Sequence, residues 1–274
     1  MAVAFDASSE SHTGTTGSVS QSSFNWTHTP VAAPQGVLVF TFSTLSSNDN
    51  ATAVSYGASS MTAVSGGRAV STGGTYIGDV KAWFLGSSVP TGAQTVTVTR
   101  TNNTDNMYAI AITVTAAANT EVHTAGIVLT QTSGNTINLN EQSVTDGQSA
   151  GVNNSLRVAA ANCTALTMQT FYTTVATSDV LSPGPSSTHL QSLDDLNFGW
   201  MAVRETTTGI GARNVGFFYT ESSLSTESLA AVHLAIKESG VGGGPVAQNL
   251  LLGNLPGFAD IGGTIDPALG LTFV

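Results

Sequence analysis

Histidine side chains are the residues of this sequence best suited to metal or acid–base chemistry, and their spacing decides which of these is available. The five histidines are His12, His28, His123, His189 and His233. No two of them form the H-E-x-x-H spacing, and none accompanies a C-x-x-C pair, so the usual zinc-binding patterns are missing. We therefore expect no metal site, and we interpret His28 and His233 as structural histidines on alternating strands.

Paired carboxylates, which could act as general acid and base, occur only as the adjacent Asp194 and Asp195. Glycoside hydrolysis needs two carboxyl groups across a cleft, whereas neighbouring residues of a strand point to opposite faces. We place both aspartates in the turn before "LNFGW". A pair assembled from distant acids, such as Asp79 and Glu205, stays open because sequence spacing does not test it.

Phosphate-binding and nucleophile motifs are also missing. The segment 209–216, "GIGARNVG", has the glycine content of a phosphate loop. It follows no strand–helix crossover and opens no helix, so we expect a loop between strands rather than a dinucleotide site. The sequence has no G-x-S-x-G elbow, no Walker loop and no EF-hand spacing. We therefore expect no cofactor and no enzymatic activity.

Charge restricts the partners that the chain can bind. The 274 residues include 7 Lys and Arg against 17 Asp and Glu, and only 9% of residues are charged. A nucleic-acid backbone would find few cations, and no basic run favours an anionic membrane surface. No apolar run reaches the roughly 18 residues of a membrane span. We expect neither nucleic acid nor membrane as a partner.

Cysteine content and the first residues bear on where the protein is made. The single Cys163 excludes an intramolecular disulfide, and we interpret it as a small buried side chain. The opening residues, "MAVAFDASSESHTG", have neither the basic nor the apolar region of a signal peptide. We expect synthesis in the cytoplasm without a cleaved export signal.

About a dozen short runs of alternating residues predict strands, among them 36–44, 94–101 and 107–116. In the last of these, Tyr108, Ile110, Ile112 and Val114 share one face, and smaller residues occupy the other. No ten-residue helical pattern separates the runs, which favours antiparallel pairing. We predict an all-β fold over residues 1–238, an antiparallel two-sheet sandwich of jelly-roll-like form.

The stretch 80–100, "VKAWFLGSSVPTGAQTVTVTR", combines an aromatic cluster with a turn and an alternating strand. Trp83 and Leu85 should share one face of a strand and Phe84 the other. The turn then returns the chain so that the next strand can pack beside them. We predict that the structural core includes Trp26, Trp83, Leu85, Val96, Val98, Ile110, Ile112 and Trp200. Tryptophans exposed as platforms for sugars are the alternative.

The last part of the sequence differs in composition from the rest. Residues 239–245 form a Gly-rich linker, and residues 246–274 contain no Lys or Arg. Glycine and proline interrupt this segment too often for a long helix. Its apolar residues need a surface to bury against, and we expect an extended arm on a neighbouring subunit, with folding back onto its own sandwich as the alternative. The anchor residues are Leu250, Leu251, Leu252, Leu255, Phe258, Ile261, Leu269, Leu271 and Phe273.

The order of several segments resembles a jelly-roll-like β-sandwich family found in structural proteins of tailed bacteriophages and in secreted bacterial proteins. The segments that carry this resemblance are "FNWTHT", "GVLVFTFS", "VSYGASSMTAV", "DVKAWFLGSSVPTGAQTVTVT", "YAIAITVT" and, after a gap, "FGWMAVRETTTGIGARNVGFFYTESSLSTESLAAVHLAIKE". The resemblance covers residues 19–238, and its motifs are structural, so it implies a fold and no reaction.

Together with the missing export signal and the arm, the resemblance implies a virion structural protein that is assembled in the host cytoplasm. The expected role is capsid decoration, in which a homo-oligomeric cement protein binds neighbouring capsid subunits partly through its arm. The alternative is a tail or head-fibre module that binds host-surface glycans through loops such as residues 206–213.

Overall fold

The computed structural model describes most of the first 240 residues of the chain, in segments. These are residues 3–13, 21–44, 49–71, 78–101, 106–130, 136–139, 142–145, 149–151, 154–158, 164–172, 180–183, 188–195, 198–206, 211–215, 217–220 and 228–240. Side chains are described for most of these residues up to 123 and, beyond that, for 188–191, 202–204, 232 and 234–240. Contacts divide the chain into two units, residues 1–244 and 245–274. The predicted arm, 246–274, lies outside the described residues.

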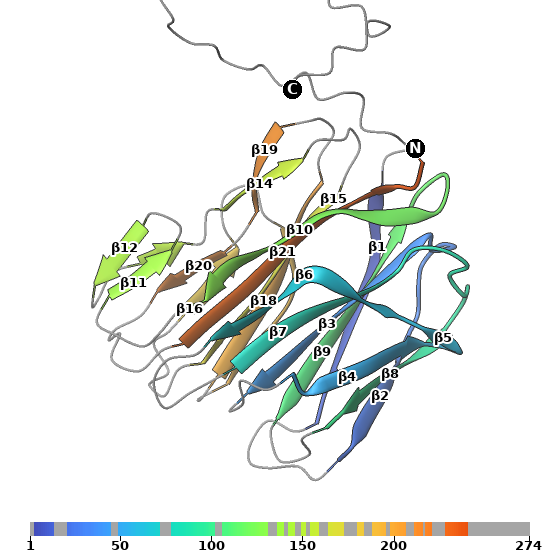
Figure 1. Cartoon of the computed structure of the whole chain (residues 1–274), viewed down its shortest axis with the longest axis horizontal. Coiled ribbons are helices and arrows are strands. Elements are labelled where there is room, and N and C mark those ends of the chain that lie inside the picture. Colours follow the sequence, from blue (N-terminus) through green and yellow to red (C-terminus); the bar gives the residue numbers. More distant parts are fainter. Residues whose placement is uncertain are drawn as a thin grey trace, which may run out of the picture. The chain divides into compact units, whose positions relative to one another are not determined.

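A five-stranded antiparallel sheet, called the central sheet below, contains β1, β9, β3, β7 and β6 (Figure 1). In the order of the sheet, these strands are β1 (Ala4–His12), β9 (Met107–Thr115), β3 (Gly36–Thr44), β7 (Gly78–Leu85) and β6 (Thr62–Ser71). β-branched and aromatic residues dominate β3 and β9, as expected for strands whose side chains pack on a pleated surface.

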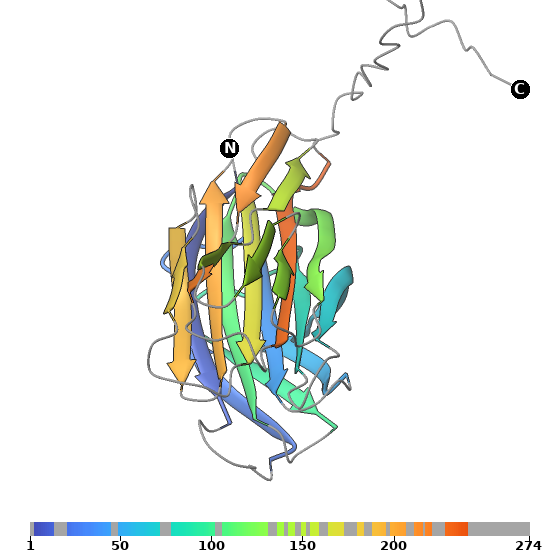
Figure 2. The same cartoon turned by 90° about the vertical axis from the view of Figure 1, so that its left-hand side faces the viewer.

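Two further antiparallel sheets lie on either side of the central sheet. The first covering sheet contains β2 (Ser23–His28), β8 (Gln94–Arg100), β4 (Ala51–Tyr56) and β5 (Ser59–Ser60). The second covering sheet contains β10 (Thr120–Thr130), β21 (Ser228–Glu238), β15 (Thr164–Tyr172), β18 (Phe198–Thr206) and β17 (Thr188–Asp195). In the side view of Figure 2, strands of the second covering sheet run roughly along those of the central sheet.

Three small antiparallel sheets complete the described strands. They pair β11 (Thr136–Leu139) with β12 (Gln142–Thr145), β13 (Ser149–Gly151) and β16 (Val180–Pro183) with β20 (Phe217–Thr220), and β14 (Asn154–Val158) with β19 (Gly211–Val215). No described residue is helical. The prediction of an all-β, antiparallel fold is therefore confirmed.

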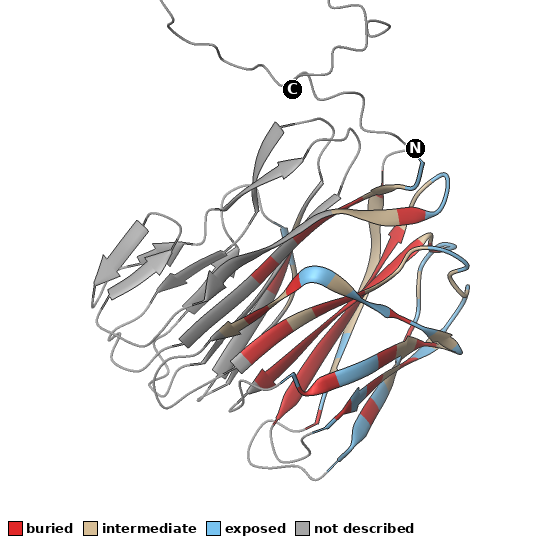
Figure 3. Cartoon of the chain, viewed as in Figure 1, coloured by how far each residue is buried: buried red, intermediate tan, exposed pale blue. Residues whose placement is uncertain are grey.

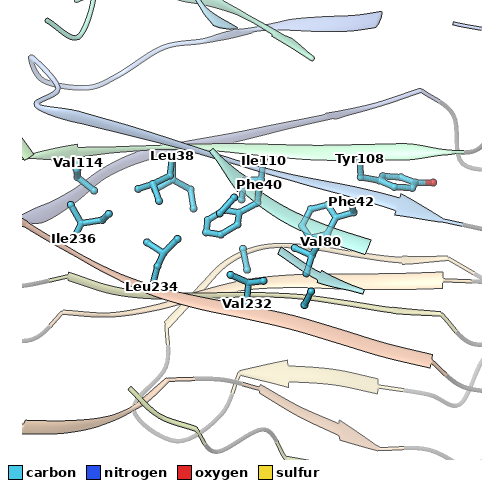
Figure 4. Packing of buried hydrophobic residues seen from close by; sticks show 14 of the residues in the cluster. Leu38, Phe40, Phe42, Val80, Tyr108, Ile110, Val114, Val232, Leu234 and Ile236 are labelled. Atoms are coloured by element: carbon cyan, nitrogen blue, oxygen red, sulfur yellow. The ribbon is translucent and has the colours of Figure 1, made fainter. Parts of the chain in front are cut away.

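The strands β3 and β9 of the central sheet are buried on both faces (Figure 3). On one face, Val39, Trp83 and Ala111 pack against residues of the first covering sheet, including Val54 and Val98. On the other face lies a second apolar cluster, which combines the central and second covering sheets (Figure 4). Its larger members are Leu38, Phe40, Phe42, Val80, Tyr108, Ile110, Ile112, Val114, Val232, Leu234 and Ile236.

The layer count differs from the two-sheet prediction, and the smaller side chains of β9 explain the difference. The face of β9 opposite Ile110 and Ile112 carries Ala109 and Ala111, which are also fully buried. Small residues on that face let the first covering sheet approach closely, so β9 has no solvent-facing side. Two packed layers would leave one face of each sheet in water, whereas here a middle layer is covered twice.

The turn between β7 and β8 lies where the sequence placed it. β7 ends at Leu85, and β8 begins at Gln94. Gly92 adopts a φ of +70°, a backbone conformation that favours glycine. Trp83 and Leu85 lie at the cluster on one face of the central sheet, and Phe84 packs against the opposite cluster, as the alternation predicted.

Thr120 joins the central sheet to the second covering sheet. Its backbone N–H donates to the Gly86 carbonyl at 2.9 Å, and its hydroxyl donates to the Gln35 carbonyl at 2.8 Å. A side chain at Gly36 would collide with the Thr120 hydroxyl, and one at Gly86 would collide with the Thr120 carbonyl. Glycine at both positions therefore lets β10 begin against the ends of β3 and β7.

Truncating adjacent residues of β3 tests burial on both faces. We expect Leu38→Ala to lower the free energy of unfolding by about 2–5 kcal/mol and Val39→Ala by about 2–3 kcal/mol, because each leaves a cavity in a different cluster. The matched control, Val31→Ala, removes the same atoms as Val39→Ala from a side chain that is 85% exposed. We expect it to change the free energy of unfolding by less than about 0.5 kcal/mol. Urea denaturation measures all three. A negligible effect at Leu38 or Val39 would contradict the double covering.

Candidate functional site

A chain of hydrogen-bonded side chains connects β1, β2 and β9 at one edge of the fold. We call it the edge network, and its members are Asp6, Ser9, Trp26, His28 and Thr113. β1 and β2 are the last strands of the central and first covering sheets. The pairing of β1 with β9 sets Ala7 opposite Thr113 and Ser9 opposite Ala111. Trp26 and His28 are two residues apart and so share one face of β2.

The distances in the edge network are those of ordinary hydrogen bonds. Trp26 Nε1 donates to Ser9 Oγ at 2.9 Å, and Ser9 Oγ lies 2.7 Å from His28 Nδ1. His28 Nε2 lies 3.2 Å from Thr113 Oγ1. Thr113 Oγ1 donates to Asp6 Oδ2 at 2.9 Å. The Asp6 carboxylate also accepts from the backbone N–H groups of Val31 and Ala32 at 3.2 and 3.0 Å.

Hydrogen-bond counting fixes where the protons lie. The single hydroxyl proton of Thr113 is directed to acceptors, the Asp6 carboxylate at 2.9 Å and the Ala7 carbonyl at 3.5 Å. Thr113 Oγ1 must then accept from His28 Nε2, which assigns the proton of a neutral imidazole to Nε2. Nδ1 carries the lone pair, and Ser9 donates its hydroxyl proton to it.

Burial keeps the edge network uncharged at its centre. His28 is fully buried, and burial lowers the pKa of its imidazole, although nearby Asp6 acts in the opposite direction. Tyr56 presents its ring at an angle of 61° to His28, with the ring centres 6.1 Å apart. Burial, and secondarily Asp6, raises the pKa of Tyr56 to about 12. Its hydroxyl has no hydrogen-bond partner among the described residues.

A charge cluster lies on β6, β7 and the connection before β4. Arg68 donates from Nε to Asp79 Oδ2 at 2.9 Å, and Lys81 contacts Asp49 at 2.8 Å. Lys81 also donates to the Ala51 carbonyl at 3.2 Å, and its ammonium lies 4.5 Å from the centre of the Trp83 ring. The cluster joins neighbouring strands and pairs its buried acid with a cation.

Asp79 is the buried acid of this charge cluster, with 5% of its side chain exposed. Burial raises the pKa of its carboxyl to about 6, against the opposing effect of the Arg68 hydrogen bond. The hypothesis that pairs Asp79 with Glu205 is not decided, because the Glu205 side chain is outside the described residues. What the described contacts give Asp79 is an arginine partner.

A groove opens where β6, β7 and β10 meet. It has a volume of about 500 Å³ and is lined by Thr62, Ala63, Val64, Ser65, Phe84, Glu121, Val122 and His123. The registers of both edge strands shift here, between Ala63 and Arg68 in β6 and between Val122 and Thr124 in β10. Such irregularities bend strands away from regular pairing, which accounts for the open space.

The groove lining includes two titratable residues, Glu121 and His123. Lys237 contacts Glu121 at 2.8 Å, and its hydrogen bond lowers the pKa of that carboxyl. Burial, followed by the charge of Lys237, lowers the pKa of the His123 imidazole. Phe84, Val64 and Val122 supply an apolar floor. The groove therefore combines an aromatic surface with a hydrogen-bond acceptor, as small-molecule sites do.

The residues that the sequence singled out are dispersed. Among the predicted core residues, Trp83, Val96 and Val98 lie in the cluster under the first covering sheet, and Trp26 and Leu85 pack against it. Ile110 and Ile112 belong to the opposite cluster. The side chain of Trp200 and the whole arm, including Leu250 and Phe273, lie outside the described residues.

Two predicted turns or loops contain strand instead. Asp194 and Asp195 are the last residues of β17, opposite Gly199 and Phe198 of β18. Both aspartates therefore pair within the β17–β18 ladder, so the prediction that places them in a turn is wrong. Residues 211–215 of the glycine-rich segment form β19, paired with β14.

The described residues contain neither a metal-binding cluster nor a membrane-spanning helix. Within them, no group of three or more His, Cys, Asp or Glu side chains could hold a metal ion. No helix among them has the length and apolar character needed to cross a membrane.

Sequence reasoning missed the edge network because its members are far apart in the chain. The signal was limited to the W-x-H spacing of Trp26 and His28, which places both on one face of a strand. Ser9 and Asp6 belong to a different sheet, and Thr113 is 107 residues from Asp6.

Comparison with family models, curated proteins and solved structures finds no match to this chain.

The pKa of Asp79 gives the charge cluster a testable pH dependence. Its folded-state pKa, about 6, lies above the ordinary value of 3.8, so its contribution to stability is full below pH 3.8 and is lost as the pH rises through 6. Relative to Asp79→Asn, we expect the wild-type chain to lose on the order of 2–3 kcal/mol of unfolding free energy between pH 4 and pH 7.5. Urea denaturation at both pH values measures this. A constant difference, or a relative gain with rising pH, would contradict it.

Proposed function

We propose that this protein is a structural component of a virion, a capsid decoration protein that binds neighbouring capsid subunits partly through residues 246–274. The virion assignment comes from the resemblance in segment order described above. The observation that carries the assembly role is the change in composition after residue 238, where a Gly-rich linker leads into an apolar segment without Lys or Arg, residues 246–274.

The composition of that segment supports a role in binding. It has two acidic residues, Asp260 and Asp266, and no Lys or Arg, and it contains ten Leu, Ile and Phe residues from Leu250 to Phe273. Burial of apolar surface contributes about 25 cal/mol per Å². An extended segment of this kind gains most when it lies along the surface of another subunit, since ordering it costs conformational entropy.

The body of the protein, residues 1–244, suits a cement role because its sheets pack on one another and few of its residues are charged. In its central sheet, β3 and β9 are buried on both faces, and only 9% of all residues carry charge. A body of this kind can present a fixed surface without steering nucleic acid toward it. Assembly in the host cytoplasm and a homo-oligomeric state are parts of the same proposal.

Deleting residues 245–274 tests the assembly role. We expect the remaining body to unfold with a free energy within about 0.5 kcal/mol of the full chain, and to lose co-sedimentation with particles of the virus that encodes it. A full-length variant in which Leu250, Leu251 and Leu252 are replaced by Ser should weaken particle binding at least about tenfold. The matched control replaces the preceding Gln248 and Asn249 by Ser. Undiminished incorporation of the truncated chain would overturn the proposal.

The groove favours a second candidate, a tail or head-fibre module that binds host-surface glycans. Sugars bind proteins by stacking on aromatic rings and donating hydroxyl protons to carboxylates, and Phe84 and Glu121 lie together in the lining. This candidate differs from capsid decoration in its partner and in the part of the chain that contacts it.

A glycan array tests the second candidate. If it holds, the full chain binds one glycan class, and Phe84→Ala weakens that binding by about tenfold or more because a stacking surface is lost. Val31→Ala, on an exposed side chain that does not line the groove, serves as the control. Glycan binding that survives Phe84→Ala would exclude the groove, and no binding at all would exclude the candidate.

A further inference from the structure

The hydroxyl of Ser9 is in a chemical environment that the proposed assembly role does not use. Ser9 and Trp26 are half-buried, whereas His28 and Thr113 are fully buried. The serine therefore meets both solvent and a buried base. β1 and β2 are edge strands of their sheets, so this hydroxyl lies at the open flank of the fold and not in its interior.

We propose that Ser9 is a nucleophile toward small carboxylic esters, with His28 as its general base and with Thr113 and Asp6 as positioning residues. Three features of the edge network meet the needs of such a reaction. The nucleophile and base lie within hydrogen-bond reach, at 2.7 Å. The base is held in one tautomer by a second hydrogen bond. The partner in that bond, Thr113, itself donates a hydrogen bond to the Asp6 carboxylate.

The order of donors and acceptors gives the direction of proton transfer. Because His28 Nε2 donates to Thr113 Oγ1, the lone pair of Nδ1 faces the Ser9 hydroxyl proton. The Trp26 indole N–H donates to Ser9 Oγ at 2.9 Å. A donor on this oxygen favours loss of its proton to His28 Nδ1, because hydrogen bonding to the charged form stabilises that form.

The reaction balances with water as the only co-reactant. Ser9 Oγ forms a bond to the ester carbonyl carbon while its proton passes to His28 Nδ1. The bond from that carbon to the leaving oxygen then breaks, and the imidazolium returns the proton to the departing alcohol. Water, deprotonated by His28 in the same way, attacks the acyl-serine and releases the carboxylic acid with Ser9 restored.

The buried imidazole is suited to this cycle because it is neutral before the reaction and because its positive charge is stabilised during the reaction. Burial favours the uncharged base. When His28 is protonated, the carboxylate of Asp6 stabilises the positive charge through Thr113. Tyr56, whose ring faces His28, brings no competing charge at neutral pH, because its own pKa is raised to about 12.

Alternate backbone N–H groups of an edge strand point away from its sheet. β1 is such a strand, and the proposal assigns the ester oxygen to outward-pointing N–H groups of β1. The indole of Trp26 lies beside the hydroxyl and offers an apolar surface for the acyl group.

Labelling of the native full-length chain with a fluorophosphonate tests the proposal directly. In this reaction Ser9 Oγ bonds to phosphorus, fluoride leaves, and the hydroxyl proton passes through His28 to solvent. Intact-mass and peptide mass spectrometry measure the label. We expect one label per chain, located at Ser9, and none in Ser9→Ala. Labelling should also disappear in urea, because the unfolded chain retains the serine and loses the base.

Ser8→Ala is the matched control, since Ser8 is half-buried on the same strand and pairs with Ile112 rather than Ala111. Neighbouring residues of a strand point to opposite faces, so this variant should be labelled as fast as the wild type. Hydrolysis of p-nitrophenyl acetate should follow the same ranking.

The positioning role of Thr113 has its own measurement. We expect Thr113→Val to slow labelling at least tenfold and to move the midpoint of its pH profile, because the imidazole loses its link to Asp6. Thr113→Ser, which keeps the hydroxyl, should restore both. A native chain that takes no label, or label that persists in Ser9→Ala, would overturn the assignment of Ser9. Equal rates and an unchanged pH profile in Thr113→Val would overturn the role of Thr113.

Discussion

The double burial of β3 and β9 in the central sheet is the constraint on which the other features of this fold depend. Most sheets in sandwiches keep one face toward water, and their strands can alternate polar with apolar residues. β3 and β9 have no such freedom, since Leu38 and Val39 are both fully buried. Neither strand contains a charged residue, and the charged residues of the central sheet lie on β1, β6 and β7. The edge network lies beside β1, and the charge cluster lies beside β6, at opposite ends of the central sheet.

The two flanks satisfy their polar groups in different ways. Beside β6, Arg68 and Lys81 pair with acids, and the buried Asp79 depends on that pairing. Beside β1, the groups are mostly neutral and form a directed series of hydrogen bonds that ends at Asp6. The first arrangement balances charge, and the second holds one serine proton against a base. The second arrangement leaves the half-buried Ser9 beside the fully buried His28.

The sequence predicted the positions of the strands better than it predicted which strands pack or pair with one another. Alternation in residues 107–114 and 80–85 correctly predicted strands, and it correctly placed Phe84 and Trp83 on opposite faces of β7. The number of layers was not accessible, because Ala109 and Ala111 are compatible with either a half-exposed face or a tightly covered one. The edge network depends on the register of β1 against β9. Register is fixed by packing between distant segments, so Ser9 carried no local sign of its base.

Thr120, which lies against Gly36 and Gly86, marks the point in the sequence where the strands of the second covering sheet begin. The described strands of the central and first covering sheets all come from residues 4–115, and those of the second covering sheet all come from residue 120 onward. β21, which carries Val232, Leu234 and Ile236, is the last of them. During synthesis from the N-terminus, Leu38, Phe40 and Ile110 would stay uncovered until the last strand of the body emerged. The order of the strands thus leaves a nascent chain with a large apolar face, which makes folding of this body a late event on the ribosome.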